Sequence, residues 1–308
     1  NTILEEAIDV PGAEPLKKTL GVAVVYDNEL IGEEYLDGYD EYTRFHGWSM
    51  TKTITGMLAG VLVDEGRMDM SAPADIAEWA SDERKNITVE DILHVSSGLD
   101  WLENYFTISE ATVMLMRSED MFTSAASCEA IHDPGAYWNY SSGDINLLSG
   151  LIRKAINNEE EFHGYAYSRL FHRIGMLNTV VETDASGLFV ASSYSYGSTR
   201  DWARFGMLFL NEGIFEGDTV LNPEWVKYMK KPAPASDGYY AGTFWLKESN
   251  PENELVDVPE DVFFADGFLG QRVYIIPSKK LVVVRLGYSM KNFSMNDFLR
   301  DIIATLPG

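Results

Sequence analysis

The chain has 308 residues, of which 45% are hydrophobic, and it carries a formal net charge of −24 at pH 7. A chain of this length and composition is expected to be globular, with room for two structural lobes. The acidic balance argues against binding to nucleic acid or to anionic membranes, since both require a basic surface, and no apolar run reaches the 18 residues of a membrane span.

The first predicted elements are a hairpin and a helix. Residues 22–25 form an apolar extended run, a turn is indicated at residues 27–28, and a second extended run follows. Apolar residues then recur at helical spacing over residues 50–62, and Gly66 is a suitable end for this helix. The helix is expected to be largely buried.

Helical patterns dominate the middle of the chain, and strand patterns return near its end. Amphipathic segments predict helices between residues 70 and 188, and a further predicted helix ends at Gly213. Three later runs are rich in aromatic and β-branched residues and predict strands. These runs are GYYAGTFWLKE, DVFFADGFLGQRVYIIP and KLVVVRLGY. A last helix is predicted from about Asn296 to Leu306.

This order of elements indicates an α+β fold. The N- and C-terminal segments are expected to share one sheet, and the middle of the chain is expected to form a mainly helical lobe. We expect residues 1–70 and 189–308 to form the sheet lobe and residues 71–188 to form the helical lobe. Clefts between lobes are favoured binding sites, so functional residues are expected where the lobes meet.

A Ser-x-x-Lys pattern stands where an extended segment enters the first long helix. Ser49 and Lys52 lie in the string FHGWSMTKTITGMLAG. Residues three apart on a helix share a face, so the serine hydroxyl and the lysine amine are expected to meet. A serine needs a nearby base to become a nucleophile, which makes Ser49 a candidate nucleophile and Lys52 a candidate base.

A second string, DPGAYWNYSSGDINLLSGLI, places Tyr140 just before a helix predicted to start near Asp144. A phenol has a reference pKa near 10, so Tyr140 can act as a base only if a cation such as Lys52 lowers its pKa. A neutral Lys52, desolvated by its buried helix, is the alternative base. The residues leave both alternatives open.

A third string, FFADGFLGQRVYIIP, has the pattern of a strand that ends in a glycine-rich turn. Gly267 and Gly270 permit a close approach of the backbone. A strand edge that faces the nucleophile can offer a backbone N–H to a developing oxyanion. The candidate donors are the N–H groups of Phe268 and of Ser49.

Taken in this order, the three strings resemble the elements of the serine β-lactamase and penicillin-binding-protein superfamily: Ser-x-x-Lys, Tyr-x-Asn and a Lys/His-x-Gly strand. The closer resemblance is to the class C β-lactamase-related serine hydrolases, through TVEDILHVSSGLDW and SYGSTRDWARFGMLFLNEG. GWSMTKT, YSSGD and DGFLGQ are most similar to the 6-aminohexanoate-dimer hydrolase branch. The resemblance covers residues 18–305 and implies an antiparallel sheet flanked by helices, with an inserted helical lobe.

The resemblance also implies roles for individual residues. Ser49 would be the acylated nucleophile, and Lys52 would accept its proton or tune Tyr140. Tyr140 would relay a proton to the leaving group. The N–H groups of Phe268 and Ser49 would bind the oxyanion.

Two departures from the family pattern bear on the substrate. Ser142 stands where β-lactamases carry Asn, and Ala265-Asp266-Gly267 stands where they carry Lys or His followed by Gly. A cation that would hold a substrate carboxylate is therefore missing, and Asp266 is expected to repel an anionic substrate if it faces the site. These departures disfavour β-lactamase and DD-peptidase activity.

The sequence therefore predicts a cofactor-free serine hydrolase that acts on a small amide or ester. The alternatives are β-lactamase or DD-peptidase activity, or a catalytically silent scaffold that binds a peptide or cell-wall fragment. Five scattered histidines and the single cysteine, Cys128, offer no metal site, and Cys128 is expected to be buried. The first residue is Asn1 rather than Met, which favours an exported form over a cytoplasmic one.

Overall fold

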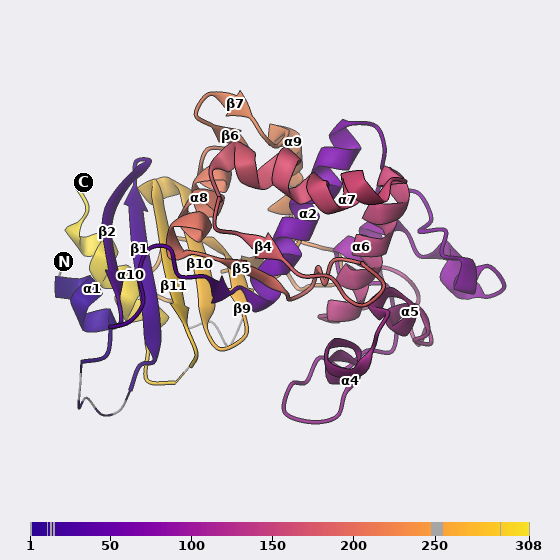
Figure 1. Cartoon of the computed structure of the whole chain (residues 1–308), viewed down its shortest axis with the longest axis horizontal. Coiled ribbons are helices and arrows are strands. Elements are labelled where there is room, and N and C mark those ends of the chain that lie inside the picture. Colours follow the sequence, from indigo (N-terminus) through magenta and orange to yellow (C-terminus); the bar gives the residue numbers. More distant parts are fainter. Residues whose placement is uncertain are drawn as a thin grey trace.

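The computed structural model describes residues 2–10, 12, 14, 16–247, 255–289 and 291–307. Its central sheet has six antiparallel strands in the order β2-β1-β11-β10-β9-β8 (Figure 1). The strands are β1 (Thr19–Tyr26), β2 (Glu29–Tyr35), β8 (Trp245–Leu246), β9 (Phe263–Gly267), β10 (Gln271–Ile276) and β11 (Leu281–Gly287). Strand β1 pairs with β11, which confirms that the two ends of the chain share one sheet.

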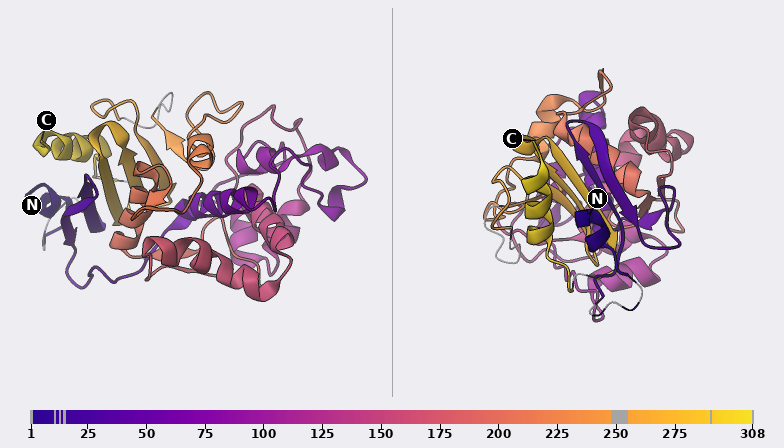
Figure 2. Two further views of the ribbon diagram at one scale, coloured as in Figure 1. Left: turned by 90° about the horizontal axis from the view of Figure 1, so that it is seen from above. Right: turned by 90° about the vertical axis from the view of Figure 1, so that its left-hand side faces the viewer.

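Helices cover both faces of this sheet. On one face, α1 (Thr2–Ala7) and α10 (Met295–Thr305) pack over a core that includes Phe264 and Tyr274 (Figure 2). On the opposite face, α8 (Thr199–Leu210) packs against β1, β10 and β11. Because both faces are covered, the central strands β10 and β11 are buried along their whole length.

The helical part of the molecule lies on the other side of α8 from α1 and α10 and is drawn to the right of the sheet in Figure 1. Its helices are α2 (Thr51–Asp64), α3 (Val89–Leu93), α4 (Glu110–Arg117), α5 (Met121–Ala126), α6 (Ser142–Ile156), α7 (Glu159–Ala166) and α9 (Pro223–Met229). Short strands are β3 (Phe45–His46), β4 (Val180–Val181), β5 (Ser195–Gly197), β6 (Ile214–Phe215) and β7 (Asp218–Thr219). Single turns of 3-10 helix occur at Trp48–Met50, Ala77–Trp79, Glu83–Asn86, His172–Ile174 and Pro277–Lys279, and a π-helical turn at Tyr167–Phe171.

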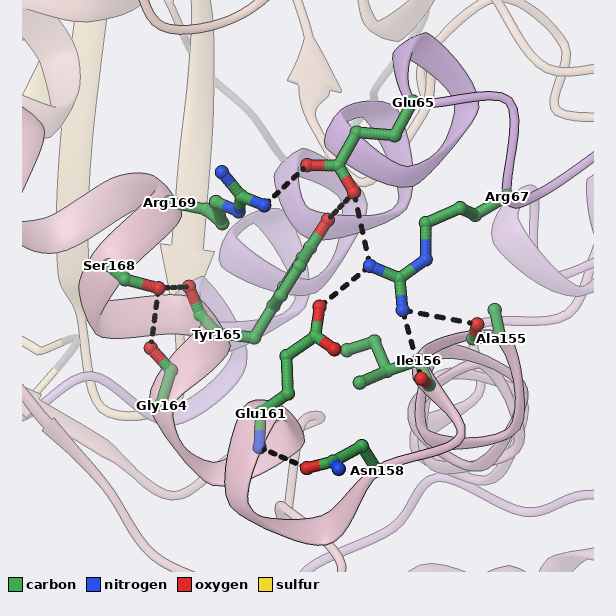
Figure 3. Close-up of polar contacts among 10 residues, drawn as sticks. All are labelled: Glu65, Arg67, Ala155, Ile156, Asn158, Glu161, Gly164, Tyr165, Ser168 and Arg169. Carbon is green, nitrogen blue, oxygen red and sulfur yellow. Dashed lines mark hydrogen bonds and ion pairs between the residues drawn. The ribbon is translucent and has the colours of Figure 1, made fainter.

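The C-terminal end of α2 is tied to α7 and to the π-helical turn by a network of charged and phenolic groups (Figure 3). Glu65 accepts a hydrogen bond of 2.9 Å from the Tyr165 hydroxyl and pairs with Arg169 at 3.2 Å. Arg67 pairs with Glu161 at 2.7 Å and also donates to the last carbonyls of α6. Networks of this kind hold geometry better than isolated surface pairs, so the far end of the helix that begins next to Ser49 is anchored.

The structure departs from two sequence predictions. Within the described residues 238–247 of the run GYYAGTFWLKE, the strand is limited to Trp245–Leu246, because Thr243 has φ of +76° and the Ala241 amide closes a tight turn onto the Phe244 carbonyl at 2.9 Å. Cys128 is half-buried rather than buried, at the edge of the main core. The division into lobes at residues 70 and 189 remains a prediction.

Candidate active site

Ser49 lies in a sharp turn between β3 and α2. Trp48, which precedes it, has φ of +49°, a left-handed conformation that is strained for a bulky residue. Position 47 requires glycine, because a Cβ there would lie only 2.6 Å from the Trp202 ring and 2.9 Å from Ser195 Oγ. The Gly47 amide also donates to the Ser195 carbonyl at 2.8 Å. Packing on all sides therefore fixes a turn that presents Ser49 at a helix start, with 9% of its surface exposed.

Lys52 lies one helical turn after Ser49, and only 1% of its surface is exposed. Its Nζ is 3.0 Å from Ser49 Oγ, 2.9 Å from Ser142 Oγ and 3.1 Å from the carbonyl oxygen of Ser192. Burial lowers the pKa of Lys52 to about 8, and the Glu103 carboxylate opposes that shift. The amine beside Ser49 is thus neutral in a sizeable fraction of molecules at mildly alkaline pH.

Tyr140 lies in the loop just before α6, with its ring centroid 4.8 Å from Lys52 Nζ. Burial, the Tyr240 phenol and the Glu103 carboxylate raise the pKa of Tyr140 well above its ordinary value. A hydrogen bond with Ser49 acts in the opposite direction and offsets this only in part. The phenol therefore stays protonated near neutral pH, which suits it to donating a proton rather than to accepting one from Ser49.

The end of β9 lies directly against the turn that carries Ser49. A Cβ on Gly267 would lie 2.3 Å from the Gly47 carbonyl oxygen, so no larger residue fits this approach. The Phe268 ring packs against Trp48 and Tyr105, with centroids 5.4 and 4.9 Å apart. The Ser49 amide belongs to the first turn of a helix, where an N–H has no intrahelical acceptor. The structure thus brings the predicted Ser49, Lys52, Tyr140, Ser142, Gly267 and Phe268 to one place.

Asp266 is the predicted site residue that the structure does not bring to Ser49. Side chains alternate along a strand, and Asp266 shares the α10 face of the sheet with Phe264, whereas Ala265 belongs to the main core on the other face. Asp266 forms an ion pair with Arg272, its register partner on β10. Its charge is therefore directed to Arg272 rather than toward the nucleophile.

The substitution Asp266→Asn is expected to lower stability without changing charge selection. Arg272 is almost fully buried, so losing its carboxylate partner should cost on the order of 1–3 kcal/mol. KM values of an anionic and a neutral ester of similar size should keep the same ratio. Thermal unfolding and paired steady-state assays measure both quantities. A fall in KM for the anionic ester alone would show that Asp266 faces the substrate.

Glu103 is a site residue that the sequence prediction missed. Its carboxylate accepts hydrogen bonds from the Ser142 amide at 2.9 Å and from the Ser142 hydroxyl. It also accepts from the Tyr105 hydroxyl at 2.7 Å and from Trp101 Nε1 at 2.6 Å. Glu103 is one of 48 acidic residues, so its charge is no signal. An acid placed two residues from an aromatic residue on each side is the signal that could have found it.

Aromatic side chains surround the remaining sides of the site. Tyr140 packs against Tyr240 and Trp245, with ring centroids 5.8 and 5.4 Å apart. Trp138 contacts the same group, at 5.1 Å from Tyr239. Within the described part of the chain, no cluster of three His, Cys, Asp or Glu side chains could hold a metal ion, and no helix is long and apolar enough to cross a membrane.

Comparisons with known proteins show which family the chain is similar to in sequence and in fold. The Beta-lactamase family model matches residues 3–304. The 6-aminohexanoate-dimer hydrolase of Paenarthrobacter ureafaciens is 21% identical over 289 residues, covering 85% of this chain and 71% of that protein. A Bacillus anthracis structure assigned as a 6-aminohexanoate-dimer hydrolase has a TM-score of 0.79 at 23% identity and covers 94% of this chain and 81% of its own. A penicillin-binding protein from Bacillus halodurans has a TM-score of 0.74 at 16% identity and covers 99% of both chains.

Proposed function

Because the chain belongs to the Beta-lactamase family, we propose that it is a serine hydrolase that cleaves an amide or ester bond through an acyl-enzyme on Ser49. The observation that carries this proposal is the 3.0 Å contact between Ser49 Oγ and a buried Lys52 amine. A hydroxyl in hydrogen-bond contact with a base of lowered pKa is the arrangement that nucleophilic catalysis requires. No metal or organic cofactor takes part in the proposed steps.

In the acylation step, Lys52 takes the proton of Ser49 while Ser49 Oγ attacks the substrate carbonyl. A pKa of about 8 lets the neutral amine form near physiological pH and still keeps it basic enough to accept the proton. The oxyanion that develops lies between the N–H groups of Ser49 and Phe268, which the close approach of β9 to the Ser49 turn supports.

The leaving group departs with a proton. Tyr140 is the proposed donor, because its raised pKa keeps the phenol protonated and its hydroxyl contacts Ser49. The proton that Lys52 took from Ser49 then returns to Tyr140, which leaves the amine neutral for the attack of water on the acyl-enzyme. Each cycle thus moves one proton from Ser49 to the leaving group and consumes one water.

The substitution Gly267→Val is expected to lower kcat more than it raises KM. The added side chain would displace the β9 edge from the Gly47 carbonyl and move the Phe268 amide away from the oxyanion. Loss of one oxyanion donor typically costs about 10²–10³-fold in kcat. Gly164→Val, in α7 with no atom within 4 Å of the added Cβ and no left-handed backbone, is the control for the mutation type. Unchanged kcat in a folded Gly267→Val protein would exclude this donor.

The surroundings of Ser49 favour a neutral substrate with apolar parts. The aromatic groups around Tyr140 and Phe268 offer apolar contact surface. Ala265 stands where related β-lactamases carry a cation, and the chain as a whole carries −24. Both features disfavour substrates with a free carboxylate, and with them β-lactam or D-alanyl substrates.

A fluorophosphonate probe tests the proposal directly, since it reacts with activated serines irrespective of the natural substrate. We expect covalent labelling at Ser49, located by peptide mass mapping. A panel of p-nitrophenyl esters, short linear amides and nitrocefin then separates esterase, amidase and β-lactamase activity, and we expect nitrocefin to be the poorest substrate. Absence of labelling in folded protein would favour a catalytically silent binding scaffold instead.

A further inference from the structure

Glu103 has no role in the steps described so far, yet two hydrogen bonds through Ser142 connect it to Lys52. Ser142 lies between them: its hydroxyl donates to Glu103 and accepts from Lys52 Nζ at 2.9 Å. Four donors converge on the Glu103 carboxylate, from Ser142 twice, Tyr105 and Trp101. A group that only accepts, as an ionised carboxylate does, satisfies all four.

The hydroxyl of Ser142 has a single hydrogen, and Glu103 decides where it points. While that hydrogen is donated to the carboxylate, Ser142 Oγ can only accept from Lys52. The carbonyl oxygen of Ser192, 3.1 Å from Nζ, can only accept in any case. A neutral amine has two N–H bonds and one lone pair. These two acceptors take both N–H bonds, and the lone pair is left facing Ser49.

We propose that Glu103 is a positioning residue that acts through Ser142 to aim the Lys52 lone pair at Ser49 and that serves as the counter-charge of Lys52 once the proton has been transferred. The inference rests on the proposed function. In the acylation step the O–H bond of Ser49 breaks, the proton forms an N–H bond on Lys52, and the oxygen bonds to the substrate carbonyl. The positive charge that appears on Lys52 then faces a carboxylate one serine away.

The competing explanation is that Glu103 only caps α6, since it accepts the amide of Ser142 at the start of that helix. A cap would affect folding but not proton transfer. The other titratable groups on the elements around Lys52 are Tyr140 before α6, Tyr105 beside Glu103, Asp144 in α6 and His46 on β3. Burial raises the pKa of Tyr140 and Tyr105, which keeps both phenols neutral, and lowers that of His46. Burial raises the pKa of Asp144 to about 7, and its carboxylate accepts a hydrogen bond of 2.9 Å from Ser97. Glu103 is the carboxylate whose charge opposes the fall in the pKa of Lys52.

The test is Glu103→Gln, assayed as kcat/KM against pH with a neutral ester. The amide can donate to Ser142 Oγ, so Ser142 can turn its hydrogen onto the Lys52 lone pair. We expect the plateau rate to fall tenfold or more while the rising limb shifts to lower pH by about one unit, because an opposite charge near the amine has been removed. Glu110→Gln is the matched control. Glu110 also bonds the same loop, at the Leu102 amide, but is exposed.

A slower enzyme with an unshifted limb would make Glu103 a structural cap and overturn the proposal. Ser142→Ala keeps the Glu103 carboxylate but removes the hydroxyl that connects it to Lys52. The rising limb of its pH profile should therefore stay in place while its plateau rate falls tenfold. Full activity of Ser142→Ala would also overturn the proposal. Ser142→Ala decides the matter if Glu103→Gln does not fold. Titration of Lys52 by NMR of ¹³C-labelled lysine, assigned with Lys52→Met, reads the pKa without substrate. It separates failure of this inference from failure of the proposed function, which the labelling of Ser49 tests.

Discussion

Replacement of Ser49 by alanine is expected to abolish fluorophosphonate labelling and to reduce turnover by several orders of magnitude. Catalytic residues that act as one unit lose their effect together, so removing the nucleophile should remove nearly all of the rate that Ser49 and its base provide. Ser49 is buried, with 9% of its surface exposed, and the turn itself is held by Gly47 and its neighbours rather than by the Ser49 hydroxyl. Loss of its hydrogen bond with Lys52 should therefore change the free energy of unfolding by only about 1 kcal/mol.

Ser149→Ala is the control for this variant. Ser149 is a buried serine in the middle of α6 that donates to the Phe189 carbonyl at 2.9 Å. Its loss should lower stability by about 1 kcal/mol but leave labelling intact. Residual turnover of more than a few per cent in Ser49→Ala would show that another group carries the acyl intermediate.

Much of the fold was predictable because the local patterns and the final packing agree. The helix after Ser49 has continuous apolar spacing and ends at Asp64, just before Gly66. The order of elements predicted that the two ends of the chain share one sheet, but the specific pairing of β1 with β11 was not predicted, since no local signal tells which distant strands are neighbours. The prediction of a longer strand that includes β8 was wrong for a local reason, because a left-handed Thr243 interrupts a sequence with high β-propensity.

The residues of the candidate site can also be divided into those that the sequence predicts and those that it does not. Ser49 and Lys52 are joined by helical spacing, so the sequence predicts their contact directly. The face on which Asp266 lies could not be predicted, because β9 carries apolar residues on both sides, so alternation in the sequence does not tell which face a residue occupies. Glu103 was missed because its importance arises only when the loop after α3 and the start of α6 meet, and that contact has no sequence spacing of its own.

The strained turn at Trp48 and the buried amine of Lys52 also affect the stability of the protein and its dependence on pH. A left-handed Trp48 and a desolvated Lys52 both cost stability, and such costs persist where the surrounding structure fixes them. Burial lowers the pKa of Lys52 from 10.5 to about 8, so the unfolded chain binds more protons between these values. The contribution of Lys52 to the free energy of unfolding therefore rises with pH between about 8 and 10.5 and is lowest below pH 8.

The variants Lys52→Met and Tyr140→Phe are each expected to lower kcat by about 10²-fold or more. The double variant is expected to lower kcat by far less than the product of these two factors. Both side chains serve one proton path from Ser49 to the leaving group. Once one of them is lost, removal of the other should therefore lower kcat little further. Tyr239→Phe, which removes a phenol hydroxyl from the same aromatic group, is the control and should retain activity. Losses that multiply would show that the two residues act on separate steps.

The pH dependence of these variants identifies the base. If Lys52 accepts the proton, wild-type kcat/KM rises with pH through a limb near 8, because the protonated amine cannot act as a base. Tyr140→Phe should keep this limb at a reduced rate, whereas Lys52→Met should lose it. A limb that disappears in Tyr140→Phe and persists in Lys52→Met would make Tyr140 the base. The amine that contacts Ser49 at 3.0 Å and the phenol whose pKa is raised by burial both favour the first outcome.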